Sequence, residues 1–273
     1  MNLQLNEALT HIKRYSALEP KAGLILGSGL GDFADTLQDK VKIPTTEIPH
    51  YPPSTVEGHE GFLVFGKHAG IPLIAVQGRT HFYEGYPLQK VTFVIRIMEA
   101  LGIRVLLVTN AAGAINPLFE PGDLMLITDQ VNFLFNNPLI GINEFDGPRF
   151  PDMSDAYARE FFPTIEAIAL QKGIDIKRGV LWVSSGPSYE TAAEIRMIRR
   201  LGGDAGSMST VPEVIVANQA GIKVIGISCL TNYATGIGQT PLSHQDVTQT
   251  AEKGREKFTS LVAGIIEEIF AKL

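Results

Sequence analysis

The chain has 273 residues, 45% of them hydrophobic, with a formal net charge of -6. This length is sufficient for a full hydrophobic core, and an acidic chain without a run of Lys and Arg argues against nucleic acid as a partner. No apolar run approaches the ~18 residues of a membrane span, and the N-terminal residues lack the uninterrupted apolar core of a signal peptide. The lone Cys229 cannot form an intrachain disulfide. We therefore expect one cytoplasmic domain over residues 1–273, with no membrane partner.

Helical and extended segments alternate along the chain. In chain order, we expect a helix at 5–18, strands at 22–26, 62–66 and 71–78, a helix at 88–101, strands at 104–110 and 124–133, a helix at 154–172, a strand at 180–186, helices at 190–202 and 211–221, a strand at 223–232 and a final helix at 243–272. This alternation predicts an α/β architecture with a central mixed, largely parallel sheet flanked by helices. Two long irregular segments, 43–61 and 136–155, are typical of functional loops or interfaces.

Polar side chains gather where the expected strands end. The segments that follow five of these strands begin at Gly27, Gly78, Ala111, Gly186 and Tyr233, and they contain Ser, Arg, His, Glu and Thr. Because the carboxyl ends of parallel strands meet in one crevice, the sequence predicts a ligand site there.

The glycine-rich segment 27–31, GSGLG, follows the first apolar strand. It misses the dinucleotide fingerprint G-x-G-x-x-G by one position, and the acidic residue expected about 20 positions later, Glu47, lies among prolines. It also lacks the lysine of a nucleotide-binding P-loop, so a nicotinamide cofactor is disfavoured. Two interpretations stay open: a plain strand-to-helix turn, or an anion site built from backbone N–H groups and the Ser28 hydroxyl at a helix start.

The segment 77–86, QGRTHFYEGY, is rich in groups that bind anions. If it is extended, Arg79, His81 and Tyr83 project to one side. A guanidinium group binds phosphate through a planar fork, and His81 is able to donate to the same anion while Glu84 holds its ring. The alternative is a solvated surface loop, but convergence with the glycine-rich segment favours an anion site.

Four further segments combine a functional interpretation with an ordinary structural one. The small residues at 109–114 either let a ligand approach the backbone or allow tight packing. Glu190 is expected at a helix start, as an acceptor for ligand N–H groups beside Tyr189 or as a first-turn acid. The hydroxyl-rich turn at 207–213 suits N-capping and phosphate binding. His244 is expected at a helix N-terminus, where a neutral imidazole suits a hydrogen bond to an alcohol. None of the six histidines has metal-ligand spacing, so no metal site is expected.

Eight segments together resemble the homotrimeric purine nucleoside phosphorylases, and the resemblance covers nearly the whole chain. They occur in that family's order: GSGLG, EGHEG, QGRTHFYEGY, TNAAGAINP, RFPDMSDAY, GPSYET, SMSTVPEV and LTN. The resemblance implies a nucleoside phosphorylase-like fold, a homotrimer and, in purine salvage, the reversible reaction of a purine nucleoside with orthophosphate to free base and ribose 1-phosphate. Orthophosphate is then a co-substrate, and no cofactor is implied.

The resemblance also implies roles for individual residues. Phosphate would be bound by Ser28, Arg79, His81, the Ala111 backbone N–H, Ser209 and His59, the last on a mobile loop. The ribose would contact Tyr83, Met208, His244 and, from a neighbouring subunit, Phe150. The purine would be held by Glu190, Asn232, Thr231 and Tyr189, where the family usually has Phe at position 189. The residues expected to carry catalysis are Asn232, Glu190 and His81.

The pairing expected at the purine favours 6-oxopurine nucleosides such as inosine, guanosine and their deoxy forms. Asn232 donates to O6 or N7 of the departing base, and Glu190 accepts its N1–H. Adenine has no N1–H and would leave the carboxylate unpaired. Relatives that cleave methylthioadenosine have Asp at the position of Asn232. The alternatives are a xanthosine or methylthioadenosine phosphorylase and, in a different class, a non-catalytic sensor of nucleosides or phosphate.

Overall fold

The structure is a computed structural model that describes residues 2–56, 61–238 and 244–273; for residues 244–253 it describes the backbone alone. The strands are β1 (Ala22–Leu26), β2 (Gln38–Pro44), β3 (Phe62–His68), β4 (Ile71–Gln77), β5 (Val105–Ala114), β6 (Leu124–Asn132), β7 (Lys177–Val183), β8 (Ala205–Ser207) and β9 (Lys223–Tyr233). The α-helices are α1 (Leu3–Tyr15), α2 (Leu88–Val91), α3 (Phe93–Ala100), α4 (Phe162–Gln171), α5 (Ala192–Arg200), α6 (Val211–Gln219) and α7 (His244–Glu268). Among the residues described, no helix has both the length and the apolar character that crossing a membrane needs.

One mixed sheet runs through the molecule in the order β2-β3-β4-β1-β5-β8-β7-β6-β9. Five of the nine described strand pairings are parallel. Strands β4, β1, β5 and β9 form its parallel centre, where every residue of β1 is buried. Their continuous apolar runs are typical of parallel strands that are covered on both faces. The predicted α/β architecture with a mixed, largely parallel sheet is therefore confirmed.

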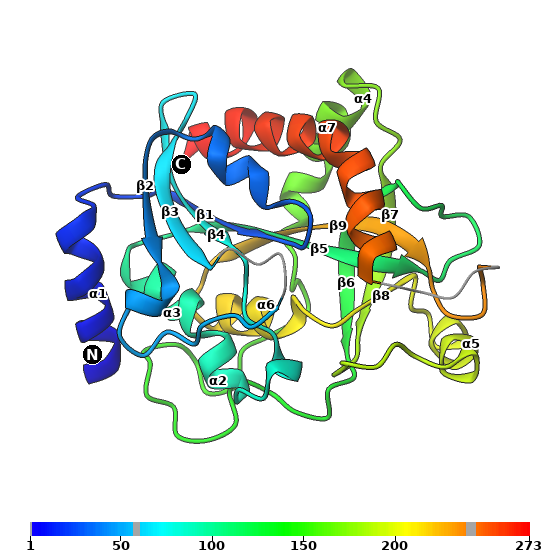
Figure 1. Cartoon of the computed structure of the whole chain (residues 1–273), viewed down its shortest axis with the longest axis horizontal. Coiled ribbons are helices and arrows are strands. Elements are labelled where there is room, and N and C mark those ends of the chain that lie inside the picture. The colour runs from blue at the N-terminus through cyan, green and yellow to red at the C-terminus, as the bar shows by residue number, and fades with distance from the viewer. Residues whose placement is uncertain (1, 57–60, 239–243) are drawn as a thin grey trace.

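Helices cover both faces of this sheet. Helices α7 and α4 lie above it in Figure 1, and α6, α3 and α2 lie below. The contacts agree with this division, since α7 presents Phe258, Leu261 and Ile265 to the core and α6 is buried almost all round.

Strand β5 has three partners, which closes part of the sheet into a ring. It pairs with β9 along its whole length and with β1 and β8 along different parts of its other edge. Since β8, β7, β6 and β9 follow one another in the sheet, β5 joins both ends of this run. The residues of β5 near its carboxyl end are consequently surrounded by strands from distant parts of the sequence.

Several predicted elements have other bounds in the structure. Strand β5 continues to Ala114 because it stays paired with β9 beyond its apolar part. The helix predicted at 154–172 begins only at Phe162, with a proline in its first turn. The helix predicted at 88–101 is two helices that break at Thr92. Strands β2 and β8 escape prediction, since β2 is a polar edge strand and β8 consists of three residues held by its neighbours.

Gly27, directly after β1, allows β1 and β5 to approach closely. A Cβ there would lie 2.7 Å from the Asn110 Cα. We expect Gly27→Ala to lower the free energy of unfolding by about 1–3 kcal/mol, the usual cost of overpacking, in denaturant titrations. Gly254→Ala is the matched control. Gly254 lies in helix α7, and a Cβ there would meet Cys229 Sγ at an ordinary van der Waals distance of 3.6 Å. Equal stability of the two variants would contradict this account of the β1–β5 contact.

Candidate active site

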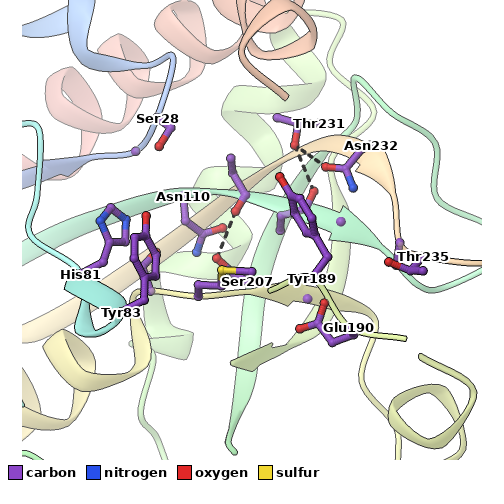
Figure 2. A pocket seen from close by; sticks show the side chains of 18 of the residues that line it. Ser28, His81, Tyr83, Asn110, Tyr189, Glu190, Ser207, Thr231, Asn232 and Thr235 are labelled. Carbon is purple, nitrogen blue, oxygen red and sulfur yellow. Dashed lines mark hydrogen bonds between the residues drawn. The ribbon is translucent and has the colours of Figure 1, made fainter. Parts of the chain in front are cut away.

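One pocket opens where the central strands end. Its empty space, with the open solvent at its mouth included, is about 790 Å³. Figure 2 shows Ser28, His81 and Tyr83 on one side of the pocket and Glu190 and Asn232 on the opposite side. The residues that line it are Gly27, Ser28, Arg79, His81, Tyr83, Asn110, Ala111, Ala112, Gly113, Tyr189, Glu190, Gly206, Ser207, Met208, Ser209, Thr231, Asn232, Ala234 and Thr235.

The floor of the pocket is an edge of β5 between two strands. On this edge β1 pairs only as far as Val108, and β8 begins to pair at Gly113. The Ala111 carbonyl points to this edge, because it accepts a hydrogen bond from Ser207 Oγ at 3.0 Å. Since the N–H and C=O of one strand residue point the same way, the Ala111 N–H faces the pocket as well. The structure thus offers a backbone donor at the position that the sequence predicts.

Ser28 lies on the glycine loop after β1. Gly29 has a φ of +74°, which glycine adopts without steric cost. The helix expected after this loop is a six-residue 3₁₀-helix at Gly31–Thr36, since the chain enters edge strand β2 directly afterwards. An anion at this loop would therefore depend on the Ser28 hydroxyl and nearby N–H groups rather than on the dipole of a long helix.

The Arg79 side chain is buried beneath the pocket. Its Nη1 donates to Glu213 Oε1 at 3.1 Å and to Thr210 Oγ1 at 3.2 Å, and its Nη2 donates to the Thr109 carbonyl. Burial lowers the pKa of Arg79, and the charge of Glu213 opposes this shift; a guanidinium group still remains protonated. Glu213 therefore offsets part of the positive charge that Arg79 brings to the pocket.

The turn before α6 is strained. Thr210 has a φ of +86° and is fully buried, a conformation that is an outlier for a β-branched residue. Its hydroxyl does not cap α6, so that part of the capping interpretation is wrong. Instead Oγ1 accepts hydrogen bonds from Arg79 and, at 2.8 Å, from Asn110 Nδ2, and it lies 3.4 Å from Ser209 Oγ. These contacts hold Ser209 at the pocket wall.

Tyr83 lines the pocket from a short 3₁₀-helix, Phe82–Glu84, and His81 lines it from the extended N-cap position. The assumed strand-like alternation therefore ends at His81, although Arg79, His81 and Tyr83 all line the pocket. The rings of His81 and Tyr83 stack at 4.7 Å. Glu84 Oε1 accepts a hydrogen bond from the His81 N–H at 2.6 Å and lies 3.3 Å from His81 Nδ1. The prediction that Glu84 holds the His81 ring is confirmed.

Burial sets the protonation states of these groups. It lowers the pKa of His81 in spite of the contact with Glu84, so the ring is neutral near pH 7. Burial, followed by the charge of Glu84, raises the pKa of Tyr83 to about 12. When Nδ1 donates to Glu84, the neutral ring presents Nε2 to the pocket as an acceptor. His81 becomes a donor to an anion only once it takes up a proton.

At the opposite side, the Asn232 amide is held in one orientation. The Thr231 hydroxyl donates to its Oδ1 at 2.9 Å (Figure 2). The amide Nδ2 donates to the Tyr233 carbonyl at 3.0 Å. A Cβ at Gly113 would lie 3.1 Å from this Nδ2, so only glycine leaves the amide undisturbed. The second Nδ2 hydrogen meets no acceptor in the described part of the chain, which makes Asn232 a donor to a ligand.

Glu190 lies on the loop before α5. The helix begins at Ala192, its N-cap is Thr191, and Glu194 completes a capping box. The interpretation of Glu190 as an ordinary first-turn acid is therefore wrong. The half-buried Glu190 carboxylate lines the pocket instead, as does its neighbour Tyr189.

Met208 and Tyr83 both line the pocket and both lie close to Gly186, which has a φ of +64°. A Cβ at Gly186 would lie 2.4 Å from Met208 Sδ and 3.3 Å from Tyr83 Cδ1. The thioether and the tyrosine ring give the pocket an apolar part, the apolar waist, beside its polar groups at Ser28 and Asn232.

Three predicted site residues are not among the lining residues. His59 lies outside the described residues, and so does the side chain of His244. Phe150 is 88% exposed and lies in a separate surface hollow that Arg149 and Met153 also line. The structure thus leaves all three roles untested.

Asn110, Ser207 and Thr235 line the pocket although no role was predicted for them. Thr235 lies in the segment that begins at Tyr233, after a predicted strand, whereas Asn110 and Ser207 belong to the segments 109–114 and 207–213. Asn, Ser and Thr are common in ordinary turns, so these residue types alone do not indicate a ligand site.

The buried ion pair of Arg79 and Glu213 gives a stability prediction. Both side chains are at most 4% exposed. We expect Arg79→Met to lower the free energy of unfolding by about 3–5 kcal/mol, because Glu213 is left as a buried, unpaired charge. Adding Glu213→Gln to that variant should restore part of the loss, as measured by urea denaturation. Simple additivity of the two changes would rule out this coupling.

Glu84 gives a pH-dependent prediction. Burial acts to raise its pKa, but hydrogen bonds from His81 and Thr55 outweigh burial and bring it to about 2, below its ordinary 4.5. The ionised group therefore stabilises the fold above pH 4.5, and this contribution is lost as the pH falls toward 2. We expect Glu84→Gln to lower the Tm at pH 7 and the difference from the unmodified chain to shrink by pH 3.

The exposed Glu19 supplies the control for this comparison. Glu19→Gln should leave the Tm almost unchanged at both pH values. A Tm difference for Glu84→Gln that stays constant with pH would argue against the ionised state as the source of the stabilisation.

Known proteins resemble this chain in sequence and in fold. Purine nucleoside phosphorylase 1 of Bacillus subtilis is 52% identical over 98% of this chain and 99% of the relative. The bovine purine nucleoside phosphorylase is 43% identical over 92% and 89% of the two chains. A Schistosoma mansoni purine nucleoside phosphorylase crystallised with inosine has a TM-score of 0.92 and 36% identity, over 97% and 96% of the two chains.

A family model agrees with these relatives over most of the sequence. The model described as the phosphorylase superfamily matches residues 21–267, a range that contains all of the lining residues of the pocket. The chain belongs to the phosphorylase superfamily and to its purine nucleoside phosphorylases.

Proposed function

We propose that this chain catalyses the reversible phosphorolysis of 6-oxopurine nucleosides, such as inosine, guanosine and their deoxy forms, in purine salvage. The single observation that carries the proposal is the pocket itself, which has anion-binding groups at one end and an amide with a carboxylate at the other. The relatives carry the same activity in their names. Orthophosphate is the co-substrate, and the reaction needs neither a metal nor an organic cofactor.

The phosphate lies at the end of the pocket that contains Ser28. We assign its contacts to Ser28, the Ala111 N–H, Ser209, Arg79 and His81, with His59 as a further donor. The orientation of the Ala111 carbonyl supports the backbone contact. Because Glu213 offsets part of the charge of Arg79, neutral donors supply much of the attraction for the anion. His81 accepts the proton of hydrogen phosphate at Nε2 or, once protonated, donates to the dianion.

The ribose lies at the apolar waist. We assign its contacts to Met208 and Tyr83, to His244 at the 5′-hydroxyl, and to Phe150 of a neighbouring subunit. The close approach of both Met208 and Tyr83 to Gly186 supports this placement. It sets the sugar directly between the attacking anion and the leaving base.

The purine lies between Glu190 and Asn232, beside Thr231 and with the Tyr189 ring against its face. As the bond between C1′ and N9 breaks, its electron pair moves into the purine and the sugar becomes positive. A phosphate oxygen then forms a new bond to C1′. Asn232 donates to N7 or O6 where negative charge develops, and Glu190 holds N1–H. Donors aimed at developing charge are usually the largest catalytic term.

The alternatives differ in substrate or in class. A methylthioadenosine phosphorylase would pair the 6-amino group of adenine with a carboxylate, whereas this chain has the Asn232 amide, which Thr231 orients as a donor. A xanthosine phosphorylase would share most of this pocket, so only a comparison of substrates distinguishes it from the proposed enzyme. A non-catalytic sensor would bind nucleoside or phosphate without turnover.

The proposal includes a homotrimer of one-domain subunits that acts in the cytoplasm. The long loop 136–155 and the adjoining segment expose large apolar side chains, at 85% for Phe135, 88% for Ile142 and 88% for Phe150. Exposed apolar patches of this kind mark interaction surfaces. In the trimer, Phe150 closes the ribose side of a neighbour's pocket, so the active site is complete only in the assembly.

A substrate panel tests the proposal. The chain should release free base from inosine and guanosine only when phosphate is present. Asn232→Asp should lower kcat/KM for inosine by about 100-fold, the usual cost of losing a donor to developing charge. It should also raise the ratio of kcat/KM for adenosine to kcat/KM for inosine. Asn6→Asp in α1 is the control and should retain full activity.

Two outcomes would overturn the proposal. If inosine and guanosine bind but no free base is released at micromolar enzyme, the chain is a non-catalytic sensor. Xanthosine or methylthioadenosine as the only substrate turned over would replace the assigned specificity.

A further inference from the structure

Thr235 places a buried hydroxyl group in the pocket. Its Oγ1 is shielded from solvent, and among the described residues it has no hydrogen-bond partner. Buried polar groups are normally paired, and an unpaired one that faces a binding site indicates a polar atom of the ligand. The proposed reaction assigns no contact to this group.

The backbone fixes the position of Thr235. The Ala234 N–H donates to the Ala114 carbonyl at 2.9 Å, and the Ile237 N–H closes a turn on the Ala234 carbonyl at 3.0 Å. Gly236 has a φ of +77°, and a Cβ there would lie 2.6 Å from the Ala192 Cβ. The turn is therefore packed between the end of β5 and the start of α5, so Thr235 belongs to a rigid wall.

This wall lies on the purine side of the pocket. Figure 2 shows Thr235 on the same side as Asn232, Tyr189 and Glu190, away from Ser28 and His81. A nucleoside whose sugar lies next to the anion directs the far edge of its base to this side. That edge of a purine carries N1 and the substituent at C6. Asn232 is assigned to N7 or O6 and Glu190 to N1–H, so the C6 substituent lies between these two groups and is the atom nearest a further donor on this wall.

We propose that the Thr235 hydroxyl donates a hydrogen bond to O6 of the 6-oxopurine and is a further substrate-binding residue of this chain. The inference rests on the proposed function and adds a second donor for the charge that reaches O6 as the base departs. A hydroxyl also accepts hydrogen bonds, so Thr235 stabilises a polar substituent at C6, while Glu190 discriminates through N1–H.

Substrates that differ at one atom isolate this contact. Inosine and 6-thioinosine both carry N1–H, but the sulfur of 6-thioinosine is a weak acceptor. Thr235→Val keeps the shape of the side chain and removes the hydroxyl. We expect it to lower kcat/KM about three- to tenfold for inosine, the range for one net hydrogen bond, and less than twofold for 6-thioinosine. Thr235→Ser, which retains the hydroxyl, should stay within twofold of the unmodified chain for inosine.

Each result decides the inference. An equal loss of kcat/KM with both nucleosides indicates a structural role for Thr235 and overturns the inference. The inference is also overturned if Thr235→Val loses no kcat/KM with either nucleoside, or loses it only with 6-thioinosine. Activity of Thr235→Val toward 6-thioinosine also shows that the variant is folded. Failure of the unmodified chain to cleave inosine would instead contradict the proposed function, so the two failures are distinguishable.

Discussion

The buried guanidinium of Arg79 is the interaction on which the pocket most depends. It links the end of β4 to β5 through the Thr109 carbonyl and to the start of α6 through Glu213 and Thr210. The same Thr210 hydroxyl is shared with Asn110 of β5. A charged network of this kind is stable in a protein interior only when its members are paired together. The residue that sequence reasoning assigns to the ligand is thus equally part of the frame that holds the site.

The pocket itself follows from how strands pair along β5. Because β1 leaves this edge before β8 joins it, a short stretch of backbone lies open toward the ligand. Glycines on either side keep that opening clear: Gly27 lets β1 approach β5, and Gly113 lets the Asn232 amide approach it. The anion end and the purine end are therefore built on one strand. In the proposed reaction, this shared floor would hold the phosphate and the nucleoside that it attacks side by side.

Much of this arrangement was predictable from sequence, and the exceptions have physical causes. The apolar runs of the central strands predict the parallel core, and eleven of the predicted site residues line the pocket. Strand β8 and the edge of β5 could not be predicted, because both are defined by pairing between distant segments. The contact between Glu84 and His81 was predictable because both lie in the same short segment and a carboxylate is a common partner of an imidazole. The partner of Arg79, Glu213, was missed because a glutamate in the first turn of a helix is also explained by the helix dipole.

The most direct test of the central claim is a crystal structure with phosphate and 9-deazainosine, a nucleoside analogue whose carbon–carbon glycosidic link resists cleavage. The account predicts both ligands in the same pocket of one chain. The phosphate should lie within hydrogen-bond distance of Ser28, the Ala111 N–H and Ser209, beneath C1′, and the base should lie against Glu190 and Asn232. Phosphate and base bound in separate cavities, or a base turned away from Asn232, would contradict it.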